Sequence, residues 1–126
     1  MNSLAQFARE AIKDVERIKE NLILCYQTTI VDIGHSLVYY TPLDTGLASS
    51  NWNVGDVGRI SLERQPMAGE KGRASISAIE SQAKTLGIGL TATFHNPVDY
   101  IEDLESGTSR QAPAGMITPT RSRVND

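Results

Sequence analysis

The sequence predicts an α+β domain: a long N-terminal amphipathic helix packed on a small antiparallel sheet with two shorter helices. Three observations predict it. Apolar residues recur with helical period through residues 3–40, apolar and polar residues alternate along 87–95, and turn residues punctuate the segments between. The chain of 126 residues has the length of one domain, so we expect a single domain over 1–126.

The longest predicted element is the helix over 3–40. Ser3 and Gln6 have the spacing of a capping box, and Pro42 disfavours helix at the residue before it, so the helix should end near Tyr40. One stripe of the helix carries residues at steps of three or four: Leu4, Phe7, Ala11, Val15, Ile18, Leu22, Cys25, Thr29, Ile33 and Leu37.

The length of this helix has a consequence. At 1.5 Å per residue it reaches about 54 Å, whereas a compact domain of this size is about 35 Å across. It therefore either bends, near Gly34, or extends beyond its own globule. An extended amphipathic helix needs a partner to cover its stripe, which indicates an oligomer or a docking surface.

Shorter elements are predicted for the rest of the chain. A capping box at Ser77 begins the second helix, Asn96-Pro97 supplies an N-cap and a first-turn proline for the third, and Gly107 ends it. We expect a strand over 47–54, a flexible loop over 55–73, a helix over 76–86, a strand over 87–95, a helix over 97–106 and an irregular interface loop over 107–117.

Composition excludes several function classes. A net charge of -3 and a pI near 5.3 argue against a nucleic-acid binder, which needs a basic surface. A lone cysteine, Cys25, forms no intrachain disulfide and suits a reducing cytoplasm. Apolar runs are far shorter than a membrane span, and the N-terminus has no signal-peptide apolar segment.

The triplet Asp44-Thr45-Gly46 is the sharpest enzymatic signal. It matches the active-site loop of aspartic proteases, whose retroviral type is a homodimer in which two aspartates share a proton. That fold is nearly all β, however, whereas here a long helix leads into the triplet, and Asp and Gly after Pro also make an ordinary turn. A retroviral-type protease using Asp44 is the enzyme alternative; Asp44→Asn would abolish its turnover.

Other reactive side chains favour ordinary structural roles. Cys25 lies on the apolar stripe, where we expect a small buried hydrophobe, and His35 and His95 are expected to be solvated. No spacing suits zinc. The acids of the third helix lack the spacing of a calcium loop and are interpreted as a solvated face, or as a surface that repels passing DNA: Asp99, Glu102, Asp103 and Glu105.

Two segments, in this order, resemble a known family. The first is Thr41-Pro42-Leu43-Asp44-Thr45-Gly46 followed by Ser49-Ser50-Asn51-Trp52. The second runs from Asn96-Pro97 to Tyr100, then through Leu104-Glu105-Ser106-Gly107-Thr108-Ser109-Arg110-Gln111-Ala112-Pro113-Ala114-Gly115-Met116. The pair resembles the tail-completion (neck) proteins of tailed bacteriophages, and the resemblance covers roughly residues 35–117.

The resemblance implies a structural role in the virion. Such proteins form a homo-oligomeric ring of about six copies at the head–tail joint, between the head connector or head-closure protein and the tail tube or tail terminator, and DNA passes through as cargo. No catalysis, cofactor or membrane goes with the family, and assembly takes place in the bacterial cytoplasm. A neighbouring joint protein, such as the tail terminator, is the alternative within this class.

The sequence departs from the family pattern in two places. Members typically carry a basic residue soon after the D-T-G, where this chain has Leu47-Ala48, and many continue beyond the G-M motif into a longer C-terminal segment. The motif residues that we expect to form the interface or to shape it are Pro42, Asp44, Gly46, Trp52, Tyr100, Glu105, Gly107, Arg110, Gln111, Pro113, Gly115 and Met116.

The irregular loop is expected to serve as a rigid contact surface. Gly107 and Gly115 permit tight turns, and a rigid loop loses little freedom on binding. Glu105, Arg110 and Gln111 are expected to pair across the rim of an interface, and Met116 to fill an apolar pocket of a partner. The alternative is that the loop only closes the core of its own domain.

Overall fold

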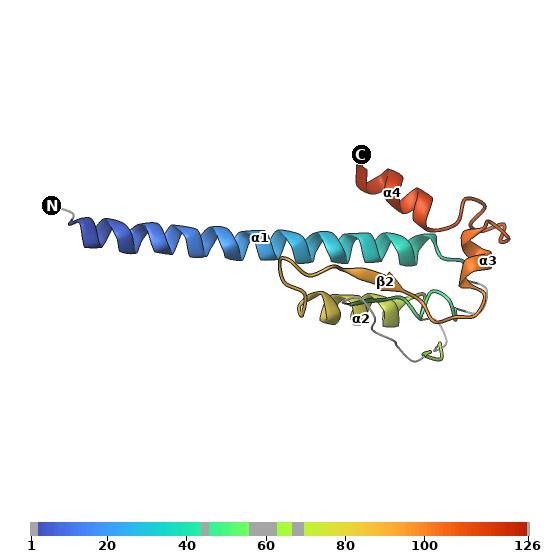
Figure 1. The fold of residues 1–126 in the computed structure, drawn as a ribbon. Helices are drawn as coiled ribbons and strands as arrows, with labels where there is room; N and C mark the ends of the chain where they lie inside the picture. Colours follow the sequence, from blue (N-terminus) through green and yellow to red (C-terminus); the bar gives the residue numbers. More distant parts are fainter. Residues whose placement is uncertain (1–2, 44–45, 56–62, 67–69, 126) are drawn as a thin grey trace.

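The computed structural model describes residues 3–43, 46–55, 63–66 and 70–125. It is an α+β fold with a long N-terminal helix, a two-stranded antiparallel sheet and shorter helices (Figure 1). In chain order the elements are α1 (Leu4–Tyr40), β1 (Asn53–Gly55), α2 (Arg73–Ala83), β2 (Thr93–His95), α3 (Ile101–Glu105) and α4 (Ile117–Asn125).

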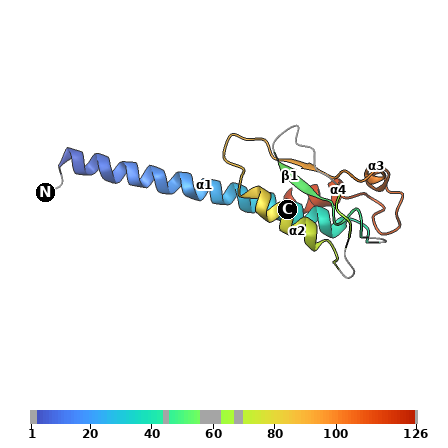
Figure 2. The same ribbon diagram turned by 90° about the horizontal axis from the view of Figure 1, so that it is seen from below.

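The long helix α1 matches the prediction at both ends. The Ser3 side chain accepts a hydrogen bond from the Gln6 amide at 3.1 Å, as in the first half of a capping box. At the other end, the Thr41 amide donates to Val38 O at 3.1 Å just before Pro42. Of the two shapes considered, the structure has the extended one, since α1 runs past Gly34 as a single helix of 37 residues (Figures 1 and 2).

The globule gathers around the C-terminal half of α1. There α2 and the sheet lie on one side of α1 and α4 lies on the other (Figure 1). The core includes Ile30, Leu37, Val38, Trp52, Val54, Ile79, Ala83, Leu86 and Met116. Gly34 permits the close approach of α1 and α2, because a Cβ at this position would lie 2.8 Å from a methyl carbon of Ile79.

The predicted strand over 47–54 is wrong for most of its length. Residues 47–50 form a turn, in which the Ser50 amide donates to Gly46 O at 3.0 Å and both Ser49 and Ser50 hydroxyls donate to the same carbonyl. Local bonds from serine hydroxyls compete with strand pairing. Only Asn53–Gly55 pairs, with Asn53 opposite His95 and Gly55 opposite Thr93.

The predicted strand over 87–95 is likewise shortened to Thr93–His95. Residues before it turn at Gly89, whose φ is +94°, and the Leu90 amide donates to Gly87 O. This stretch is held by α1 rather than by a second strand: the Tyr26 hydroxyl donates to Leu90 O at 2.6 Å. Apolar and polar residues do alternate along this segment, but only three of its residues pair with β1.

Helix α2 begins three residues earlier than the predicted 76–86 and ends at Ala83. Its N-cap is Gly72, with φ +81°, and the Glu70 carboxylate accepts from the Ala74 amide at 3.0 Å. The capping box expected at Ser77 is therefore not used, because that residue is exposed in mid-helix. The predicted loop over 55–73 thus ends in α2, and residues 56–62 and 67–69 lie outside the described residues.

The C-terminal elements also differ from prediction. Helix α3 spans Ile101–Glu105 instead of 97–106, because Asn96 uses its side chain to accept from the Val98 amide and opens a turn there, not a helix. The expected irregular loop over 107–117 ends at Met116, and α4 begins at Ile117. The sequence analysis missed α4 altogether; Pro119 in its first turn is compatible with a helix start.

Candidate functional site

The second motif folds into a compact unit closed by Glu105. Its carboxylate accepts from the Met116 amide at 2.8 Å and from the Ile117 amide at 3.1 Å, so it caps the N-terminus of α4. The chain turns back on itself at Gly107 and Gly115, whose φ values are +87° and +74°. These contacts make residues 105–117 a preformed corner of the molecule.

The side chains of this corner divide between inside and outside. Met116 is 1 % exposed and fills the core of its own chain, so in this structure it is not an apolar plug presented to a partner. Glu105 is engaged in its own chain in the same way. Gln111 accepts from the Leu43 amide at 2.9 Å, which joins the second motif to the first. Arg110 and Pro113 are exposed.

We expect Glu105→Ala to destabilise the fold and Glu105→Gln to do so less. Alanine leaves the Met116 and Ile117 amides without their acceptor, and loss of an N-cap costs about 1–2 kcal/mol. Glutamine keeps one carbonyl oxygen to accept a bond. Urea unfolding of both variants measures the difference; equal stability of alanine and wild type would contradict the capping role.

The first motif is built around a buried tryptophan. Trp52 is 5 % exposed, and its indole N–H donates to the Thr41 hydroxyl at 2.8 Å, which in turn donates to Leu37 O at 2.6 Å. Pro42 is buried and Gly46 adopts φ +78°. Asp44 lies outside the described residues. The described part of this motif therefore closes the C-terminal end of α1.

A polar network that the sequence analysis missed holds the strand end of this motif. The Arg64 guanidinium donates to Ser50 O, to Trp52 O and to the Asn53 side chain, at 2.8 to 2.9 Å. Ser75 of α2 also contacts this motif: its hydroxyl accepts from the Trp52 backbone amide at 2.9 Å and donates to Ser49 O at 2.5 Å. Burial lowers the pKa of Arg64, and the nearby Glu70 carboxylate partly offsets this.

We expect Arg64→Lys to destabilise the fold by about 3 kcal/mol, because a lysine cannot reproduce the planar fork that meets three acceptors. Hydrogen bonds to charged groups contribute about 1.5–3 kcal/mol each, and buried carbonyls would lose their donors. Gln65→Lys, next in the chain and exposed, is the matched control. Urea unfolding measures the stability of both variants. A loss of stability no larger than that of the control would contradict the role of the Arg64 hydrogen bonds.

The remaining candidate reactive side chains are Cys25, His35 and His95. Cys25 is exposed, which corrects the expectation that it is buried, because α1 has already left the globule at this residue. His35 Nε2 lies 3.4 Å from a Glu80 carboxylate oxygen, and His95 is half-buried in β2. Among the residues described, none form a group of three or more metal-ligating side chains, and no helix is long and apolar enough to span a membrane.

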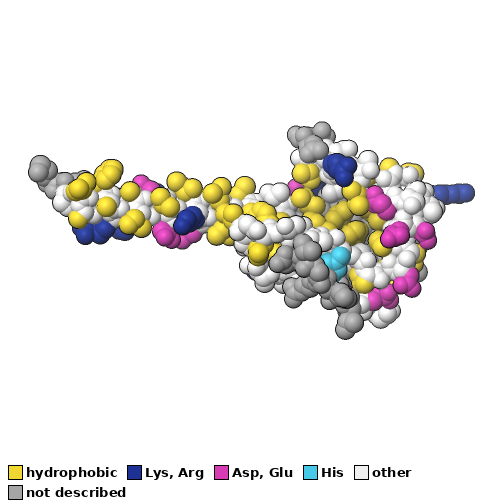
Figure 3. Space-filling view, viewed as in Figure 1, with side chains coloured by type: hydrophobic (Ala, Val, Ile, Leu, Met, Phe, Trp, Pro, Cys, Tyr) yellow, Lys and Arg dark blue, Asp and Glu magenta, His cyan; other side chains and the backbone are white. Residues whose placement is uncertain are grey.

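The N-terminal part of α1 forms a second, larger surface, which we call the overhang and define as residues 4–25. Every residue of it is exposed. Its large apolar side chains are 36 to 85 % exposed: Leu4, Phe7, Ile12, Val15, Ile18, Leu22, Ile23 and Leu24. Figure 3 shows hydrophobic side chains along the length of the helix where it extends from the globule. The N-terminal part of the predicted apolar stripe, from Leu4 to Leu22, is thus left uncovered on a single chain.

Comparisons with protein-family models, with curated proteins and with solved structures each found no match.

Proposed function

We propose that this chain is a structural protein of the tailed-phage neck, which assembles into a homo-oligomeric ring joining the head connector to the tail. DNA passes through the ring as cargo. The observation that carries the proposal is the overhang, because its apolar side chains are exposed to water in an isolated chain. A surface of this kind is typical of a protein that works as one part of an assembly.

The resemblance of the two motifs to the neck proteins supports the same function. In the structure these motifs meet: Gln111 of the second contacts Leu43 of the first, and Trp52 and Met116 belong to one core cluster. Segments that are far apart in the sequence thus build one end of the globule. We interpret the motifs as the scaffold that shapes this end of the molecule, and its exposed residues as the contact points.

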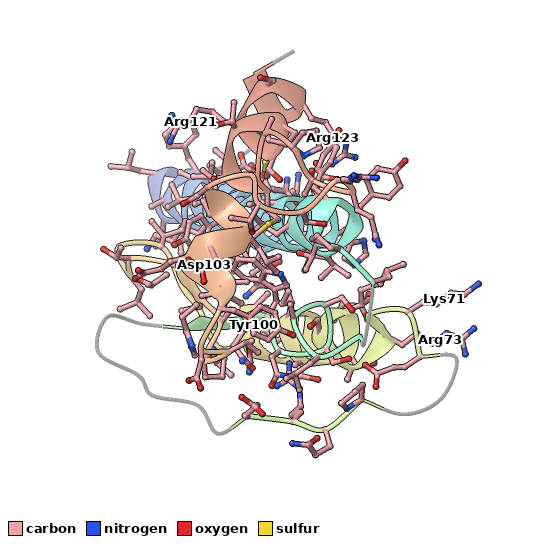
Figure 4. The ribbon with its side chains drawn as sticks, turned by 90° about the vertical axis from the view of Figure 1, so that its right-hand side faces the viewer. Lys71, Arg73, Tyr100, Asp103, Arg121 and Arg123 are labelled. Carbon is pink, nitrogen blue, oxygen red and sulfur yellow. The ribbon has the colours of Figure 1, made fainter. Side chains whose placement is uncertain are left out.

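The end of the globule that faces away from the overhang carries separated charges. Tyr100 and Asp103 lie near its centre, while Arg121 and Arg123 lie on α4 at one edge and Lys71 and Arg73 project at another (Figure 4). The first turn of α3 holds Glu102 and Asp103, both exposed. Separated charges of both signs fix orientation between protein partners, which suits a joint between two different neighbours.

Electron microscopy of phage particles tests the proposal. Deleting the gene from the phage genome that carries it should give DNA-filled heads beside unattached tails, and supplying the wild-type gene from a plasmid should restore joined particles. Normally joined particles after deletion would overturn the neck function.

A complementation with Asp44→Asn separates the structural proposal from the protease alternative. A ring protein loses at most some turn stability, so the variant should restore joined particles. Failure of this variant at normal expression and normal ring formation would instead favour a catalytic role of Asp44.

A further inference from the structure

An apolar groove lies on the same helix as the overhang, within the globule. It runs between α1, β2 and α4 and has a volume of about 290 Å³. Its apolar lining comes from Ile33, Leu37, Phe94, Ile117 and Val124. An exposed ion pair between Arg123 and Asp32, at 3.2 Å, joins α4 to α1 beside it. This volume is near the lower end of the range for binding pockets, about 300–1,000 Å³.

The groove continues the apolar stripe of the overhang. At 100° per residue, Val15, Leu22 and Ile33 lie within about 20° of one another around α1. Ile33 is one wall of the groove, and the other two are about half exposed in the overhang. Figure 3 shows apolar side chains along the overhang and again in the hollow beneath α4. One face of α1 therefore carries two uncovered apolar sites.

The shape of the groove restricts what can enter it. Its walls are α4 on one side and Phe94 of β2 on another, so an incoming helix must be free of attached structure on its sides. In the part of this chain that the structure describes, the overhang is such a helix, because the C-terminal half of α1 is covered by its own α2 and α4.

The charges of the overhang favour a protein partner over a membrane or a nucleic acid. Its basic residues are Arg9, Lys13, Arg17 and Lys19, and its acidic residues are Glu10, Asp14, Glu16 and Glu20, so the two signs cancel. Helices that lie on membranes carry a polar face rich in Lys and Arg, and nucleic-acid binding needs a basic surface. A helix with no net charge can approach the groove of a second copy without net repulsion.

The area available sets the scale of this contact. The overhang has 22 residues, so it is about 33 Å long and about 10 Å wide, and one face of it offers roughly 330 Å² in projection. A stable interface buries about 800 Å² of accessible surface per partner. A single overhang contact is therefore small for a stable pair, whereas in a closed ring each copy makes two such contacts, one through its overhang and one through its groove.

We propose that the overhang of one copy packs over the groove between α1 and α4 of the next copy and inserts its apolar side chains into it, and that this head-to-tail contact closes the ring. The direction rests on the proposed function: a ring that joins a head to a tail has two different faces, which a two-fold contact does not produce. Repeated head-to-tail contacts between different surfaces produce a closed ring when the rotation fits.

Cysteine cross-linking of the purified full chain tests the contact. In a Cys25→Ser background, one protein carries Val15→Cys in the overhang and a second carries Val124→Cys in the groove. Mixing the two and adding a short bis-maleimide should give a cross-linked pair that contains both. The control replaces Val15→Cys with Glu20→Cys, about 140° around the helix, and should give background only.

A single chain that carries both cysteines then decides between two geometries. Head-to-tail contact should give a ladder on a denaturing gel that stops at the ring. Cross-linking that stops at the dimer would mean that two copies insert their overhangs into each other, and it would overturn the proposal. Absence of cross-linking between overhang and groove would also overturn it.

The outcomes for the contact and for the neck function are independent. If gene deletion gives unjoined particles but the cysteines do not cross-link, the neck function is supported and the proposed contact is wrong. If the cysteines give a ladder but deletion leaves the particles joined, the contact is supported and the neck function is wrong.

Discussion

If the copies assemble through the overhang as we propose, we expect that replacing Val15 and Ile18 together with aspartate reduces the protein to monomers and leaves the globule folded. Both side chains are at least half exposed in the single chain, so their loss removes little from its own stability. Full burial of a valine or isoleucine side chain at an interface contributes about 1.5–3 kcal/mol. Loss of two such side chains weakens association by about a thousandfold, at about 1.4 kcal/mol per factor of ten.

Sedimentation velocity at micromolar protein measures this change, and urea unfolding verifies that the globule is unchanged. The matched control is Gln6→Asp with Asn21→Asp, which adds the same two charges off the apolar stripe of the same helix. We expect the control to assemble as wild type does. If the Val15 and Ile18 variant also assembles normally, the overhang is not the surface that holds the copies together.

Substitution of Gly115 by alanine is expected to cost the fold about 3 kcal/mol or more. The glycine has φ +74°, where an L side chain is strained by about 1–3 kcal/mol. A Cβ there would also lie close to the carbonyl oxygen and the carboxylate of Glu105, so the cap of α4 must move. Since domains of this size have only about 5–15 kcal/mol of stability, the loss is a large fraction of the total.

Urea unfolding with Gly87→Ala as the control tests this prediction. Nothing lies within 4 Å of a Cβ built at Gly87, and its φ is not in the left-handed region, so we expect little change there. Hydrogen exchange of the α4 amides locates the damage, because α4 loses its cap first. If the Gly115→Ala variant is as stable as the Gly87→Ala variant, the corner accommodates the added Cβ without loss of stability.

The features that follow from local sequence were predicted correctly. The α+β class and both ends of α1 depend on helical period, a serine cap and a proline, all within a few residues of the position concerned. The left-handed turn at Gly107 is of the same kind. The overhang was one of two shapes left open, since helix length alone does not distinguish a bent helix from an extended one.

The elements that failed depend on contacts between distant residues. Trp52 and its neighbours alternate like a strand, but their backbone groups bond to Arg64 and Ser75 instead of to a second strand. Helix α4 is capped by Glu105, which lies in α3, so no cap is visible in the sequence beside its start. Arg64 lies in a polar stretch of the sequence, and no pattern there predicted that its guanidinium would bond three acceptors.

The overhang also predicts a concentration dependence of hydrogen exchange. In proteins most helical stability comes from tertiary packing, which residues 4–25 lack in a single chain. In dilute protein, the amides of residues 4–25 should therefore exchange with solvent far faster than those around Ile79, where the core is closed. If a neighbouring copy covers the overhang as we propose, these amides should become protected as the protein concentration rises.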